Sequence, residues 1–233
     1  REFFEYFLSF FAMILANPTN FPKNIFEDVI KSHLVILPFY SDLLNLPNLQ
    51  SNKVAILDPV VKLIHETSEP QFFHLLYRFL FTFFEVYYIT IPENMPKICD
   101  ALTSTFAKQD PTLIYPSILF LQNAVSFEKQ QQMREEETAI FPNISSELAP
   151  MIFESLLGIM INNIMETPPD EGSGQFNLSY EIVSYFKDIN DLKGLIFDWL
   201  TQNFDSMIES SEWKYRAAAL ALVYCITSGP NFD

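Results

Sequence analysis

The sequence predicts an all-α protein made of stacked helical pairs, and three observations lead to this fold class. Glycine is scarce, at 5 of 233 residues, which disfavours folds that need Gly-rich turns or phosphate loops. Apolar residues make up 49% of the chain and include 24 phenylalanines, which is enough for a large core. Proline-containing turns separate apolar segments that are long enough for helices.

Turns marked by acidic residues recur along the chain, each before an apolar helical segment. They are Glu27-Asp28, Ser68-Glu69-Pro70, Gln109-Asp110-Pro111 and Ser211-Glu212. Asp28, Pro70 and Pro111 follow one another at steps of 42 and 41 residues, and the 101 residues from Pro111 to Glu212 equal two such steps plus an insertion. An all-helical period of roughly 40–47 residues is typical of HEAT or armadillo-like repeats, which stack into a solenoid because one unit cannot bury its apolar face alone. We therefore expect residues 1–233 to form a single HEAT-repeat α-solenoid (an α-α superhelix) of about five helical hairpins, as a fragment of a longer solenoid.

The first half of the chain divides into six predicted helices. Residues 2–16 form a Phe-rich helix that ends at Asn17-Pro18. Asn24 caps a second helix to about Leu44, with a kink or a break at Pro38. Ser51 or Asn52 caps a third to about Glu66, which Pro59 bends unless the helix starts late. The other three have a proline near the start and run from Pro70 to about Ile89, from Glu93 to Gln109 and from Pro111 to Phe127.

The second half predicts four helices and two irregular stretches. Ser145 or Ser146 caps a helix to about Glu166, and helices follow at about 177–187, 190–207 and 212–227. The last begins with Glu212 at the positive end of the helix dipole, and Ser228-Gly229-Pro230 stops it. Residues 128–141 are an extended helix end or a solvated loop, and 166–176 are a flexible loop. The expected repeats are 2–45, 51–90, 94–127, 145–187 and 190–228.

The charge and the cysteine content indicate which partners and which cellular environment suit the protein. The net charge of −15 disfavours binding to nucleic acid or anionic membranes and suits a basic partner, although acidity that only keeps the protein soluble explains it equally well. Cys99 and Cys225 lie in apolar helical stretches, which favours buried thiols in a reducing compartment. The apolar run from Leu75 to Ile91 contains Arg78, Thr82 and Glu85, so we expect buried helices and no membrane insertion.

Patterns that carry catalytic chemistry are missing from the sequence. There is no Gly-rich phosphate motif and no C-x-x-C, and His65-Glu66 is followed by Glu69 where a zinc protease needs its second histidine. His33, His65 and His74 stand in different helical segments, where a lone histidine is more often hydrogen-bonded or exposed than catalytic. A Ser–His–acid group stays open because geometry, not sequence position, defines it. We expect a binding protein that is not an enzyme and uses no cofactor or metal.

The stretch Glu212 to Ala219 with Ser228-Gly229-Pro230 resembles the pattern of Trp, two basic residues flanking an aromatic, an alanine run and Glu-Gly-Pro in the importin-beta (karyopherin beta) family of nuclear transport receptors. The other landmarks are Tyr87-Tyr88, Asn94-Met95-Pro96 through Leu102 to Lys108-Gln109-Asp110, the charged stretch from Ser126-Phe127-Glu128 to Glu137, and the Pro168–Gly174 loop in the place of the family's acidic loop. Their order and spacing cover most of the chain and correspond to roughly the fifth to ninth HEAT repeats.

The resemblance implies nucleocytoplasmic protein import as the function. Members of the family bind Phe-Gly repeats of nucleoporins, carry cargo through nuclear pores and release it on binding the GTP form of the small GTPase Ran. The implied location is the cytoplasm, the nucleus and the nuclear pore at the envelope. A basic cargo or the importin-alpha adaptor would bind mostly through regions outside this fragment.

The resemblance also implies the site residues. A Phe-Gly pocket would lie between the helices that hold Leu8, the apolar pair Ile56-Leu57, and Leu102, with Lys53 standing where the family has an acidic residue. Each of these apolar residues would equally suit the core. Asp170 and Glu171 remain of the acidic loop and would contact Ran or a basic cargo helix, with Phe176 near the position of the family's Trp.

Two other classes of function remain open at this point. Another HEAT scaffold, such as an exportin or a phosphatase regulatory subunit, would have no Phe-Gly affinity and would bind partners on its concave face. A helical enzyme would need a pocket with convergent polar groups and a perturbed pKa, for which the sequence offers no candidate.

Overall fold

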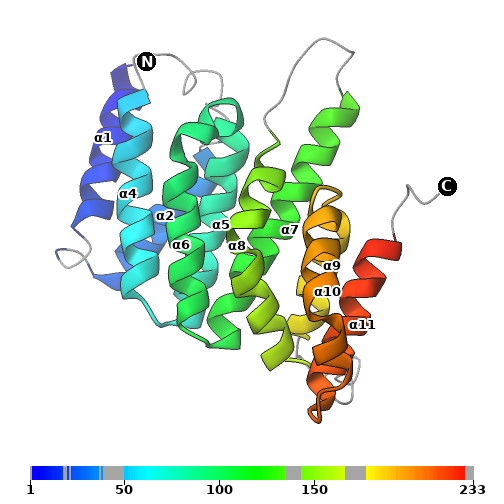
Figure 1. Ribbon diagram of the computed structural model, residues 1–233. Helices are drawn as coiled ribbons and strands as arrows, with labels where there is room; N and C mark the ends of the chain where they lie inside the picture. Colours follow the sequence, from blue (N-terminus) through cyan, green and yellow to red (C-terminus); the bar gives the residue numbers. More distant parts are fainter. Residues whose placement is uncertain are drawn as a thin grey trace. The chain divides into compact units, whose positions relative to one another are not determined.

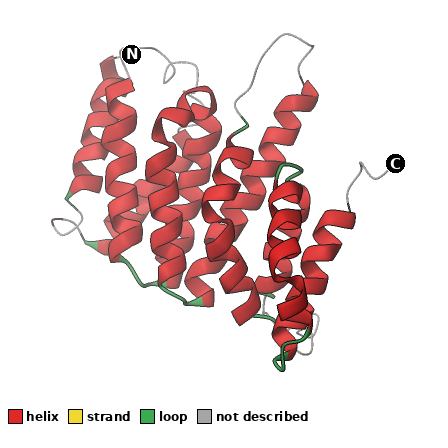
Figure 2. Ribbon diagram, viewed as in Figure 1, coloured by secondary structure: helices red, strands yellow, loops and turns green. Residues whose placement is uncertain are grey.

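A computed structural model describes residues 2–17, 20, 22–36, 38, 50–134, 143–165 and 177–228. In this part of the chain all regular structure is helical, with ten α-helices and no strand, so the predicted all-α class is confirmed. The chain divides into two compact units, residues 1–142 and 143–233. Figure 2 shows the helices of both units, and each unit is described separately below.

Unit 1 consists of two layers of helices. One layer contains α1 (Glu2–Ala16), α4 (Gln50–Glu66) and α6 (Met95–Ala107), and the other contains α2 (Lys23–Ile36), α5 (Pro70–Tyr87) and α7 (Pro111–Arg134). Within each layer neighbouring helices pack side by side, and α1–α2, α4–α5 and α6–α7 also contact each other (Figure 1). The chain therefore alternates between the layers with each helix.

The α5 helix supplies most of the aromatic core of unit 1. Ten of its residues are buried, among them Phe73, Tyr77, Phe83 and Phe84. Apolar side chains nearly all round α5 fit its position, because it packs against α2, α4 and α7 on different sides. Tyr77 is fixed by its hydroxyl, which lies 2.5 Å from Thr105 Oγ1 and 3.2 Å from the carbonyl oxygen of Ala101, both within hydrogen-bond distance.

Several helix ends in unit 1 differ from the prediction. The α2 helix begins at Lys23, so Asn24 lies inside it and the predicted cap was wrong. The helix ends at Ile36, shortly before Pro38, and the prediction of a helix to Leu44 falls on residues outside the described part. Helix α5 stops at Tyr87 and continues as the 3-10 helix η4 (Tyr88–Asn94). The α7 helix runs on to Arg134, so residues 128–134 are an extended helix end and not a loop.

The turn from α6 to α7 contains residues that end the first helix and begin the second. Gln109 has φ 54°, the left-handed conformation that commonly follows a helix C-terminus. Asp110 then caps α7, because its Oδ1 accepts hydrogen bonds from the backbone N–H and the hydroxyl of Thr112 at 2.9 and 2.7 Å. The acid that marks this turn in the sequence is thus a helix cap.

Unit 2 contains α8 (Ile144–Asn162), α9 (Leu178–Asp188), α10 (Leu192–Ile208) and α11 (Trp213–Thr227). Helix α9 packs on α8 and α11, and α10 packs on α11. The α8 cap is Asn143, whose side chain accepts from the N–H of Ser146, so the predicted caps Ser145 and Ser146 were wrong. The α8 helix also ends at Asn162, earlier than Glu166.

Helix α8 is the one described helix that is long and apolar enough to cross a bilayer by length and composition alone. More than half of its residues are buried against the rest of the protein. Core helices pass the same test when they are this apolar.

Lys108 ties the end of α4 to the turn after α6. Its Nζ donates hydrogen bonds to the carbonyls of His65 at 3.0 Å and Thr67 at 3.1 Å, where the negative end of the α4 dipole lies. We expect Lys108→Met to lower the free energy of unfolding by about 1–2 kcal/mol, since hydrogen bonds from a charged donor are lost while the aliphatic stem is kept.

Thermal denaturation followed by far-UV circular dichroism measures this effect. Lys214→Met is the matched comparison in unit 2, because Lys214 donates one such bond, to the carbonyl of Asn162 at 3.0 Å. We expect this variant to lose less unfolding free energy than Lys108→Met. An unchanged melting temperature for Lys108→Met would refute the capping role.

Candidate functional site

Two grooves flank α4 on the layer that it forms with α1 and α6. The α1–α4 groove has a volume of about 210 Å³ and the α4–α6 groove about 470 Å³. Both have Asp58 and Lys62 of α4 in their lining, so the two grooves meet along one stripe of this helix. We call the pair the α4 grooves.

The α1–α4 groove is mainly apolar. Leu15 and Ala16 come from the last turn of α1, and Pro59 and Leu63 come from successive turns of α4. Leu15 and Leu63 are buried at the floor, whereas Ala16 is exposed at the edge. Pro59 and Leu63 share one face of α4 because residues four apart stack above each other in a helix.

Two pairs of polar side chains cross the α4–α6 groove. Lys97 of α6 donates to Asp58 of α4, and His65 Nε2 lies 2.9 Å from Asp100 Oδ2. All four side chains are at least one third exposed, so each pair contributes no more than about 1 kcal/mol to stability. These polar groups can therefore exchange partners when another molecule enters the groove.

The predicted pocket residues lie beneath these grooves. Ile56, Leu57 and Leu102 have 0% exposed surface, so they belong to the core of unit 1. The side chains of Leu8 and Lys53 lie outside the described part, as do Asp170, Glu171 and Phe176. The structure brings α1, α4 and α6 together, but the surfaces open to a ligand come from other residues of these helices.

Sequence reasoning missed Leu15, Pro59 and Leu63. It chose the adjacent apolar pair Ile56-Leu57, and such a pair is usually drawn into the core. The signal that could have found the groove is the charged stripe of Asp58, Lys62 and Glu66 at a spacing of four. A stripe of this kind marks the solvent face of α4, and the residues beside it line the grooves.

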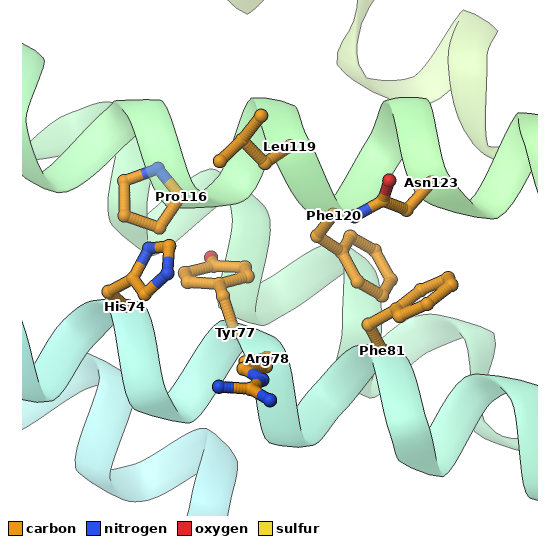
Figure 3. Close-up of a pocket in the computed structure, with 8 residues that line it drawn as sticks. All are labelled: His74, Tyr77, Arg78, Phe81, Pro116, Leu119, Phe120 and Asn123. Atoms are coloured by element: carbon orange, nitrogen blue, oxygen red, sulfur yellow. The ribbon is translucent and has the colours of Figure 1, made fainter.

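A further groove in unit 1 lies in the other layer, between α5 and α7. Its volume is about 330 Å³, and its lining includes Tyr77, Arg78, Phe81, Leu119 and Phe120. Figure 3 shows Tyr77 and Phe120 between the two helices, while Arg78 lies over α5. In unit 2 a mainly apolar groove of about 460 Å³ lies between α10 and α11, lined by Phe197, Phe204 and Val223 among others.

The histidines and cysteines of the described residues lie in separate places. His33 is buried and stacks on Phe11, and burial lowers its pKa to about 3. His65 pairs with Asp100, and His74 lies at the edge of the α5–α7 groove. Cys225 is buried, as predicted, which raises its pKa to about 12, whereas Cys99 is half-buried. No group of three metal-ligating side chains occurs among the described residues.

Comparison of the chain with protein-family models, with curated proteins and with solved structures found no match. The candidate site therefore depends on the grooves of the chain itself. Of these, the α4 grooves are formed by the three helices that the sequence predicted to hold a pocket.

Proposed function

We propose that this chain is a segment of a nuclear transport receptor that binds Phe-Gly repeats of nucleoporins in the α4 grooves. The observation that carries the proposal is the apolar α1–α4 groove, which lies between neighbouring helices of one layer. Its volume of about 210 Å³ suits one aromatic side chain. The larger α4–α6 groove beside it offers room for a second contact.

The proposed architecture is a HEAT-repeat solenoid. Support comes from five pairs of contacting helices, α1–α2, α4–α5, α6–α7, α8–α9 and α10–α11. The marked turns before Pro70, Pro111 and Trp213 join the two helices of three of these pairs, whereas Glu27-Asp28 lies inside α2 and is not a turn, so that part of the predicted period was wrong. In such a solenoid each neighbouring pair of helices in a layer offers a groove, so many similar weak sites occur along one surface.

The energetics suit transient binding. Burial of one phenylalanine ring contributes roughly 1.5–3 kcal/mol, which alone gives weak and rapidly reversible binding. Several such contacts on one flexible Phe-Gly chain add through effective concentration, while each contact still releases quickly. A receptor that must cross the pore needs this combination.

The other partners follow from the same proposal. We place the protein in the cytoplasm, the nucleus and the nuclear pore, with the GTP form of Ran and a basic cargo or importin-alpha as partners. Contact of Asp170 and Glu171 with Ran or cargo stays a prediction, since both lie outside the described residues. The net charge of −15 favours a basic partner.

The test is a fluorescence-anisotropy titration of the whole chain with a labelled Phe-Gly repeat peptide. A peptide with every Phe replaced by Ser is the control for the ligand. We expect weak binding that the Phe→Ser peptide loses. Ala16→Trp, which fills the α1–α4 groove, should weaken binding at least fivefold.

Ala107→Trp is the matched control variant. Ala107 is exposed and is the last residue of α6, as Ala16 is the last of α1, but it lines neither of the α4 grooves. Binding that both variants retain would move the site away from the α1–α4 groove. A folded chain without any Phe-dependent binding would overturn the transport proposal and favour a general HEAT scaffold.

A further inference from the structure

We infer that the α5–α7 groove of unit 1 binds a peptide segment in which carboxylates flank an aromatic side chain. This groove lies in the other layer of helices from the α4 grooves, and its partner chemistry differs from that of a neutral Phe-Gly repeat. The inference stands independently of the proposed transport function.

The floor of the groove is aromatic and held in place. Tyr77 and Phe120 are buried, and their ring centroids lie 6.1 Å apart. The Tyr77 hydroxyl is bonded to Thr105 and Ala101 of α6, so its ring is fixed before any ligand binds. Phe81 and Leu119 are half-buried at the sides, where they offer apolar surface to an incoming ring.

The volume of about 330 Å³ limits what fits. It lies at the lower end of the roughly 300–1,000 Å³ that is usual for ligand pockets. One aromatic side chain with its neighbouring backbone fills such a space. A helix is too wide to enter the groove and would only cover its opening. A short extended peptide segment is therefore the occupant that the shape favours.

The charge of the lining selects an acidic segment. Arg78 and His74 are exposed at the α5 edge, and no carboxylate lines the groove (Figure 3). Arg78 has no ion pair among the residues that the structure describes. Helix α7 carries no acidic residue from Pro111 to Phe127, so its face does not repel an incoming carboxylate.

This charge is unusual for the protein. The whole chain has 29 acidic and 14 basic residues, yet the acidic or basic side chain that lines this aromatic groove is the guanidinium of Arg78. Arginine binds carboxylates with two parallel hydrogen bonds, which gives both strength and orientation. Nucleic acid is disfavoured because binding to a phosphate backbone needs many cations, and the groove offers one arginine.

The experiment uses the whole chain and fluorescein-labelled peptides. The probe is Asp-Glu-Phe-Asp-Glu. The two control peptides are Asn-Gln-Phe-Asn-Gln, whose side chains are uncharged, and Asp-Glu-Ser-Asp-Glu, which has no aromatic side chain. We expect binding of the probe to be at least tenfold tighter than that of either control peptide. Equal binding of the acidic and the uncharged peptides would overturn the inference.

Variants locate the site. Arg78→Glu should weaken binding of the acidic peptide at least tenfold, and Arg78→Gln should weaken it less. Lys193→Glu makes the same kind of charge change in unit 2 and should leave the affinity within twofold. Since Arg78 is exposed, its variants should keep the circular dichroism of the wild type, and unchanged binding by folded Arg78→Glu would refute this location.

The two binding proposals separate in the same assay. Ala16→Trp should leave the acidic peptide unaffected, and Arg78→Glu should leave the Phe-Gly peptide unaffected. If the wild-type chain fails to bind one of the two peptides and binds the other, only the proposal for the first peptide has failed. Displacement of the acidic peptide by the Phe-Gly peptide would show one shared site and would overturn the inference.

Discussion

Replacement of Phe84 by alanine should lower the free energy of unfolding of unit 1 by about 3–5 kcal/mol, the usual cost of removing a buried phenylalanine ring. Phe84 is 1% exposed and lies at the centre of an aromatic cluster. Its ring packs edge-on against Phe120 at 6.0 Å and Phe127 at 6.1 Å, and it lies 5.4 Å from Tyr88. The cavity would open between α5 and α7, which cannot close over it without moving these rings.

Urea unfolding measures the effect with two probes. Trp199 and Trp213 are the two tryptophans of the chain and both belong to unit 2, so fluorescence follows unit 2 while far-UV circular dichroism follows both units. Phe10→Ala is the control, because Phe10 is a helical phenylalanine of unit 1 with 56% exposure and should cost under about 1 kcal/mol. A Phe84→Ala loss no larger than that of Phe10→Ala would contradict the assigned core.

Acidification below pH 6.5 should destabilise unit 1 through His33. The side chain is fully buried between Phe11 of α1 and Phe79 of α5, and burial lowers its pKa from 6.5 to about 3. Between these two values the unfolded state binds a proton that the folded state does not, so stability falls as the pH falls. The loss is about 1.4 kcal/mol per pH unit, or about 2 kcal/mol at pH 5 compared with neutral pH.

His33→Leu is the variant that isolates this effect. The difference in unfolding free energy between wild type and His33→Leu should be constant above pH 7 and should change steadily between pH 6.5 and 4. Comparison of the two proteins cancels the titrations of other groups, including Glu85. Burial raises the pKa of Glu85, so its titration increases stability as the pH falls and opposes the effect of His33. A difference that does not vary with pH would show that His33 titrates normally in the folded protein.

Local signals in the sequence were enough to predict most helices. Proline near the start of α5 and α6, and the acid before α7, identified their beginnings within one or two residues, because caps act through neighbouring backbone groups. The α8 cap was placed wrongly because three candidate residues, Asn143, Ser145 and Ser146, lie together. Ser145 is buried, so tertiary packing decided between them.

The site was harder to predict than the helices. Apolar residues of α4 divide between the core and the grooves, and the division depends on where α1 and α6 lie. Ile56 and Leu57 point into the core, whereas Pro59 and Leu63 line the α1–α4 groove. The α5–α7 groove was not predicted either, since Arg78 and Phe120 are 42 residues apart and only the packing of the two helices brings them together.

The alternation of unit 1 between two layers has a consequence for how the chain reaches its fold. Among the described helices, the main contacts of unit 1 join neighbours in the chain or helices with one other between them, so contacting residues are much closer in sequence than the two ends of the unit. Helical chains whose contacts are mainly of this kind fold faster than chains whose contacts join distant segments. Each new helical pair can dock on the one before it as the polypeptide emerges from the ribosome, and no early segment of unit 1 has to wait for its last helix.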